Sequence, residues 1–110
     1  MATAKREPLP ACHEVHEVRI SFNEGRFDYG REGNPVHARQ GDCIRWSSDR
    51  SFAVHFQGIS PFDKVDFSGN DGENTGEVTK TAPSGTYKYI VAVMDEGKRI
   101  HIDDPHVIVP

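Results

Sequence analysis

Gly85-Thr86-Tyr87-Lys88-Tyr89-Ile90-Val91-Ala92-Val93 is the longest run of β-forming residues in the sequence. Tyr, Ile, Val and Thr dominate the run, and these side chains suit a pleated, half-buried surface. Side chains alternate between the two faces of a strand, so Tyr87, Tyr89, Val91 and Val93 share one face. Because that face is large and apolar, we expect it to lie against the core.

The segment before this run predicts how the strand begins. Ala82-Pro83-Ser84-Gly85 is a turn signal that ends any earlier element. Tyr87, two residues after Gly85, resembles the tyrosine corner of Greek-key sandwiches, in which a Tyr hydroxyl ties down the connection that enters a strand. The alternative is that Tyr87 is simply a core aromatic residue.

The rest of the chain reads as short strands separated by turn signals. Alternating patterns predict strands at residues 13–22, 26–29, 36–39, 42–47, 52–56, 77–80, 98–102 and 106–109. Residues 68–76 have the composition of a flexible surface loop, and a helical turn could lie between Gly58 and Asp66. This spacing predicts an all-β fold, either an antiparallel β-sandwich or a barrel. Residues 1–11 are expected to form a flexible tail before one domain, residues 12–110.

Composition limits the classes of partner. The chain has 110 residues, a formal net charge of -4 and no Lys/Arg cluster, which argues against nucleic acid as a partner. No apolar stretch approaches the length of about 20 residues that crosses a bilayer, so no membrane association is expected. The first ten residues lack the apolar segment of a signal peptide. We therefore expect a cytoplasmic protein, or a periplasmic or secreted one if a leader has been removed.

Two cysteines, Cys12 and Cys43, are present. A reducing cytoplasm favours two free thiols, and one disulfide between them is the alternative.

Three segments resemble cupredoxins in their order and spacing. Gly41-Asp42-Cys43-Ile44-Arg45-Trp46 is similar to the Gly-Asp-x-Val-x-Trp strand of that family, and residues 82–89 are similar to its Pro-Gly-x-Tyr-x-Tyr strand. Residues 104–109 resemble the terminal strand of small bacterial cupredoxin-like domains. The resemblance covers most of the chain from Val15 onward, and it implies a Greek-key β-sandwich of the cupredoxin type.

The same resemblance implies that the blue-copper ligands are missing. That site needs two His, one Cys and usually a weak Met, because a thiolate and two imidazoles suit a copper ion that cycles between two oxidation states. The Cys position corresponds to Val91, and one His position corresponds to Phe52. Neither side chain binds a metal, so we expect no cofactor and no electron transfer at these lost-ligand positions.

Other residues could hold a metal in a different place. Cys12, His13 and His16 carry donors suited to copper or zinc, although a strand would place His13 and His16 on opposite faces. The acidic residues of the 58–76 region, which are Asp63, Asp66, Asp71 and Glu73, do not match the spacing of a calcium loop.

No catalytic motif is found, so an enzyme is not expected. The sequence therefore predicts a copper-free module that binds a protein partner or a small ligand, as a monomer or a dimer. We expect its contact surface near the loops Ser47–Ser51 and Met94–Gly97. The alternative is a copper or zinc carrier that uses histidines outside the usual blue-copper site.

Overall fold

The computed structural model describes residues 12–69 and 73–110, and in these residues the chain forms β-strands and no helix. The strands are β1 (Val15–Asn23), β2 (Arg26–Asp28), β3 (Val36–His37), β4 (Cys43–Ser48), β5 (Phe52–Phe56), β6 (Asp66–Gly69), β7 (Glu73–Glu77), β8 (Gly85–Met94), β9 (Ile100–Asp103) and β10 (His106–Val109). The described part of the chain accordingly contains no helix that could span a membrane. The expected tail, residues 1–11, lies outside the described residues.

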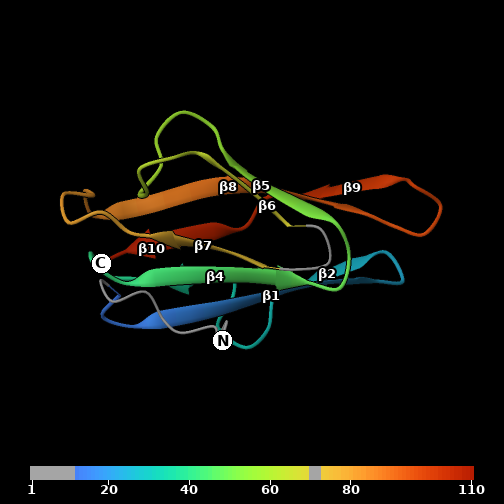
Figure 1. The fold of residues 1–110 in the computed structure, drawn as a ribbon, viewed down its shortest axis with the longest axis horizontal. Helices are drawn as coiled ribbons and strands as arrows, with labels where there is room; N and C mark the ends of the chain where they lie inside the picture. Colours follow the sequence, from blue (N-terminus) through green and yellow to red (C-terminus); the bar gives the residue numbers. More distant parts are fainter. Residues whose placement is uncertain (1–11, 70–72) are drawn as a thin grey trace, which may run out of the picture.

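The strands form two sheets (Figure 1). The first sheet has the order β2-β1-β4-β7, and the second has the order β3-β10-β8-β5-β6, with β9 also paired to β8. Both sheets are mixed, because β1 runs parallel to β4 and β3 runs parallel to β10. The purely antiparallel arrangement expected from the sequence is therefore wrong. Alternation of side chains shows which face is buried but does not show the direction of the neighbouring strand.

The core lies between the two sheets and is built from the alternating faces. Val18, Ile20 and Trp46 of the first sheet are fully buried, as are Val91 and Phe56 of the second. The other predicted core residues of β8, which are Tyr87, Tyr89 and Val93, are also buried. The strand that dominates the sequence thus lies at the centre of the second sheet, as its apolar face predicts.

Trp46 is the centre of an aromatic cluster that joins the two sheets. Its ring centroid lies between 4.8 and 6.4 Å from the rings of Phe56, Phe62, Phe67 and Tyr89. Its indole Nε1 donates a hydrogen bond to the Tyr89 hydroxyl at 3.2 Å. The cluster therefore satisfies the one polar group that burying this indole would otherwise leave without a partner.

The tyrosine-corner geometry is present at the start of β8. The Tyr87 hydroxyl donates a hydrogen bond of 2.5 Å to the carbonyl of Pro83, four residues upstream. Because the Tyr87 ring is also buried, the two interpretations of this residue hold together.

The region between Gly58 and Gly76 differs from its expected structure. No helical turn lies between Gly58 and Asp66, and the expected flexible loop at residues 68–76 contains the end of β6 and most of β7. A side chain at Gly76 would come within about 3 Å of the rings of Phe67 and Phe62. Glycine at this position lets those rings pack against the strand. From composition alone, the same glycine suggests a flexible loop.

The two cysteines form a disulfide, Cys12–Cys43, with Cα atoms 5.4 Å apart. The expectation of two free thiols is therefore wrong. Cys43 lies on the face of β4 opposite the core, yet it is fully buried because the segment that holds Cys12 covers it. The His13 amide donates to the Gly41 carbonyl at 3.0 Å, and this bond holds the same segment against the turn before β4.

Candidate functional site

The most exposed apolar side chains of the strands lie on the outer face of the second sheet. The alternation that buries Tyr87 and Tyr89 turns Ile90, Ala92 and Met94 outward. In the register of β8 with β9, Ala92 lies opposite Ile102 and Met94 lies opposite Ile100. These five residues form one strip, which we call the outer strip: Ile90, Ala92, Met94, Ile100 and Ile102.

Ile100 and Ile102 give the outer strip its exposed apolar area. Ile100 is 55% exposed and Ile102 is 65% exposed, and Met94 is 39% exposed. Isolated exposed apolar residues are ordinary on protein surfaces, whereas neighbouring ones on adjacent strands form a patch of the kind that contacts other molecules.

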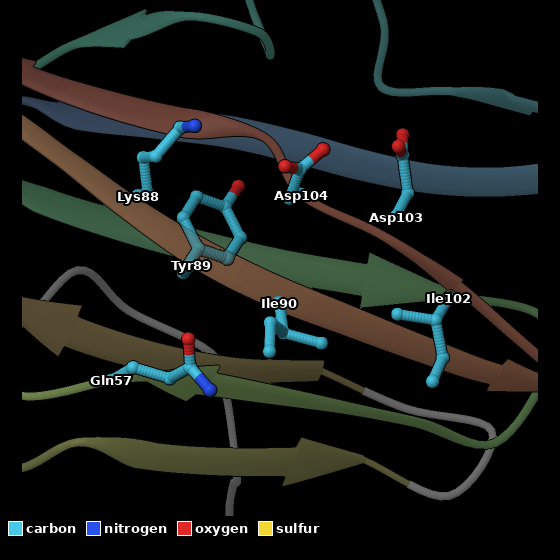
Figure 2. A pocket seen from close by; sticks show the side chains of 7 residues that line it. All are labelled: Gln57, Lys88, Tyr89, Ile90, Ile102, Asp103 and Asp104. Atoms are coloured by element: carbon cyan, nitrogen blue, oxygen red, sulfur yellow. The ribbon is translucent and has the colours of Figure 1, made fainter.

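A hollow of ≈ 420 Å³ adjoins the strip. Figure 2 shows Ile90 and Ile102 in this hollow together with the amide of Gln57, the ammonium group of Lys88 and the carboxylates of Asp103 and Asp104. Tyr89 completes the lining, and Figure 2 shows its ring between Lys88 and Ile90. The hollow therefore combines apolar lining residues with the ammonium group of Lys88 and the carboxylate of Asp104, while the Asp103 carboxylate is bonded to Tyr29.

The opposite, inner face of β9 is anchored to the first sheet. The His101 ring stacks on Phe22 of β1, with centroids 4.2 Å apart. Tyr29 donates a hydrogen bond of 2.7 Å to Oδ2 of Asp103. Burial raises the pKa of Tyr29, and the hydrogen bond to Asp103 raises it further, so the phenol stays protonated and remains a donor.

The loop between β8 and β9 is held by His101 and Arg99. Nε2 of His101 lies 2.8 Å from Oδ2 of Asp95, and the Arg99 amide donates to Oδ1 of Asp95 at 3.0 Å. These bonds, that of His101 first, lower the pKa of Asp95 to about 2. The side chains of the inner face and of the turn thus have partners inside the molecule, while the outer strip faces solvent.

The loops expected to form the contact surface, Ser47–Ser51 and Met94–Gly97, lie at the end of the molecule that carries the turn between β8 and β9. The Met94 amide donates to the Ser51 carbonyl at 3.1 Å. Arg50 donates to the Phe22 carbonyl at 3.1 Å, and its other terminal nitrogen lies 3.4 Å from Glu96. Figure 1 shows the β8–β9 and β1–β2 hairpins projecting from the same end. Arg50 therefore connects the two hairpins.

A different group of residues could hold a metal ion. One donor atom from each of Glu14, His16 and Asp42 lies within 4.8 Å of the other two. Nε2 of His16 is 2.9 Å from Oδ2 of Asp42, and that carboxylate is almost fully buried. The same oxygen accepts a hydrogen bond from the Arg39 amide at 2.9 Å. Asp42 therefore has a structural role whether or not a metal binds.

The residues that the sequence proposed as ligands separate in the structure. The sulfur of Cys12 is part of the disulfide and offers no thiolate. His13 lies beside Gly41, whereas His16 faces Asp42. The sequence suggested neither Glu14 nor Asp42. His16 and Asp42 are 26 positions apart, which is no recognisable ligand spacing, and only the parallel pairing of β1 with β4 brings them together.

The expected lost-ligand positions lie in the core, and one acidic residue of the 58–76 region is paired with a histidine. Phe52 and Val91 are 4% and 0% exposed, and both belong to the core cluster. Nδ1 of His55 lies 2.5 Å from Oδ1 of Asp66, so this carboxylate has a partner within the second sheet. Asp71 lies outside the described residues.

Comparison with known proteins adds no relative: no family model, curated protein or solved structure matches this chain.

Proposed function

We propose that the chain is a copper-free binding module built on a Greek-key β-sandwich of the cupredoxin type. Support comes from the strand order, in which β3, β4 and β5 belong alternately to the second, first and second sheets. Further support comes from Phe52 and Val91, which fill the expected ligand positions with apolar groups that no metal binds.

The module binds a protein partner without catalysis, and the outer strip is its contact surface. The observation that carries this proposal is the exposure of Ile100 and Ile102 side by side with Met94 on one sheet face. Burying apolar surface stabilises a complex by roughly 25 cal/mol per Å² before the costs of association. The charged rim of the neighbouring hollow, with Lys88 and Asp104, would orient the partner. A small ligand in that hollow is the alternative form of the same function.

A photo-reactive residue at position 102 tests this contact surface in the cell of origin. We expect a discrete covalent adduct from position 102, and none from position 59. Ile59 is a matched control because it is an isoleucine that is 74% exposed and lies outside every strand. Equal labelling from both positions, or no adduct from position 102, would remove the outer strip as the contact surface.

The proposed location is an oxidising compartment rather than the expected cytoplasm. The support is the Cys12–Cys43 disulfide, since such bonds persist in oxidising compartments and are rare where glutathione keeps thiols reduced. Alkylation of protein taken directly from cells, followed by mass spectrometry, should find both cysteines unlabelled. Complete labelling of both cysteines would show free thiols and would favour the cytoplasmic location expected from the sequence.

Metal binding is a second candidate function, because Glu14, His16 and Asp42 converge. Imidazole and carboxylate donors suit Zn²⁺, with bonds of about 2 Å that place neighbouring ligand atoms about 3.3 Å apart. The present separations of up to 4.8 Å would need only a small closure. A bound ion would replace the hydrogen bond between His16 and Asp42.

Calorimetric titration of untagged protein with Zn²⁺ or Cu²⁺ tests this candidate. Stoichiometric binding should be lost in His16→Ala and retained in His55→Ala. His55 is a suitable control because it also faces a carboxylate, Asp66, but in the other sheet. Equal loss in the two variants, or no binding by the unmodified protein, would reject the site.

A further inference from the structure

The strand β9 and its flanking residues have a self-complementary sequence. The segment reads Lys98-Arg99-Ile100-His101-Ile102-Asp103-Asp104, with two cations at one end, two carboxylates at the other and an isoleucine on each side of a central histidine. When two such segments run antiparallel, each charge meets its opposite and each isoleucine meets an isoleucine. A two-fold axis through His101 would produce this register.

The backbone of β9 has a free edge in the described part of the structure, where the strand pairs only with β8. The Asp95 amide donates to the Arg99 carbonyl at 2.9 Å, which fixes the alternation of the antiparallel ladder. His101 and Asp103 therefore direct their backbone groups toward β8. Ile100 and Ile102 direct their N–H and C=O groups away from β8, toward the open edge.

This edge keeps only part of the usual protection against pairing, because β9 is four residues long and Asp103 points inward. Edge strands commonly carry a proline, an outward-facing lysine or a bulge. The four residues of β9 include no proline and no lysine, and both outward-facing side chains are exposed isoleucines. The strand is also held in place, because Phe22 and Tyr29 anchor its inner face. An ordered edge of this kind can accept another strand without first losing conformational freedom.

We propose that β9 pairs antiparallel with β9 of a second copy of this chain. In this pair, Ile100 lies opposite Ile102 of the other copy, and the two residues exchange both backbone hydrogen bonds. Arg99 faces Asp103 once at each end of the pair, and Lys98 and Asp104, which lie just beyond the two ends of β9, bring a further pair of opposite charges close to one another. The second sheet of one copy and the second sheet of the other join into one continuous sheet. The outer strips of the two copies then become a single apolar surface.

The choice of a second copy depends on charge complementarity. A strand of unrelated sequence would gain the same backbone bonds, but only a segment with this order of charges satisfies both ends. The inference rests on the proposed function and deepens it, since a second copy paired at the edge of the outer strip doubles the apolar surface that a protein partner would contact.

A pair of cysteine variants tests the register in purified protein. Directly opposed residues that exchange backbone bonds have Cα atoms about 5.5 Å apart, which a disulfide can span. Mixing Ile100→Cys with Ile102→Cys under mild oxidation should give a covalent dimer that contains one copy of each. Either variant alone should give little dimer, because identical positions would be offset by two residues and lie beyond the limit of about 7 Å. Mass spectrometry would confirm that Cys12–Cys43 stays intact.

Sedimentation of the protein over about 1–500 µM should show a reversible dimer. Ile102→Lys should abolish this dimer, whereas Ile59→Lys should leave it unchanged. Lys98→Glu and Asp104→Lys should each weaken self-association by about tenfold, because each places like charges opposite one another at both ends. An equal mixture of these two variants should associate again.

A monomer at all concentrations, or a dimer that the mixed cysteines do not capture, would overturn the self-pairing. If an adduct with another protein still formed from position 102, the proposed function would stand with a different partner. If the adduct at position 102 joined two copies of this chain and contained no other protein, the self-pairing would stand and the outer strip would need no second partner.

Discussion

The hydroxyl of Tyr29, just after β2, donates a hydrogen bond of 2.7 Å to the carboxylate of Asp103 at the end of β9. This bond joins two segments that are 74 residues apart in the sequence and belong to different sheets. It lies on the inner face of β9, while the outer strip faces the opposite direction. The inner face of β9 is thus held by contacts within the molecule, while its outer face is available to another molecule.

Tyr29→Phe should lower the free energy of unfolding by about 1–2 kcal/mol, because Asp103 loses its donor while the ring remains in place. Urea unfolding followed by Trp46 fluorescence measures this change. Asp103→Asn keeps an oxygen acceptor for Tyr29 and should cost less than Tyr29→Phe. A larger cost for Asp103→Asn would show that the charge of Asp103, rather than this hydrogen bond, is what stabilises the fold.

Removing the disulfide with Cys12→Ser and Cys43→Ala should lower the free energy of unfolding by about 3–4 kcal/mol. The bond joins residues separated by 31 positions, so it restricts the unfolded chain substantially. Alanine suits the buried Cys43, and serine suits the more accessible Cys12. Reductant should destabilise the unmodified protein by the same amount and leave the variant unchanged. A protein that is indifferent to reductant would contradict the prediction.

Tyr89→Phe should lower the free energy of unfolding by about 1–3 kcal/mol, because the buried indole N–H of Trp46 loses its acceptor. Trp46→Phe removes the other partner and part of the aromatic cluster. The double variant should cost less than the sum of the two single changes, since it leaves no unpaired polar group. Chemical denaturation of all four proteins measures this coupling, and strict additivity would mean that the bond contributes nothing.

Asp95 should make the stability of the protein depend on pH in acid. The pKa of Asp95 is about 2 in the folded protein, against an ordinary value of 3.8. The ionised carboxylate therefore stabilises the fold fully above about pH 4, and this contribution is lost as the pH falls toward 2. The difference in unfolding midpoint between the unmodified protein and Asp95→Asn should be constant above pH 4 and shrink below it. A difference that persisted at pH 2 would argue against the bond between Asp95 and His101.

Stoichiometric Cu(II) should leave the protein colourless, because Phe52 and Val91 stand where the resemblance places copper ligands. Visible absorption spectroscopy measures this, and an intense Cu–thiolate charge-transfer band would overturn the assignment of these positions. Weak binding at Glu14, His16 and Asp42 would give no such band, because none of these residues supplies a sulfur ligand.

Much of the strand content could be predicted from the sequence, since apolar alternation depends only on neighbouring residues. The strands at residues 52–56 and 106–109 have their expected limits, and the buried face of β8 is the predicted one. The strands β6 and β7 were missed because Gly69 and Gly76 resemble loop residues. In the structure these glycines lie beneath the rings of Phe52 and Phe67.

The sequence by itself determined that the fold is all-β, which side chains of β8 form the core, and that Tyr87 could close a tyrosine corner. It did so because a strand of period two needs only local information to separate its two faces. Tertiary structure alone decided that Cys12 meets Cys43, that His16 meets Glu14 and Asp42, and that β9 presents two isoleucines at an open edge. Each of these three features depends on which strands become neighbours, and the packing of the whole core determines which strands do so.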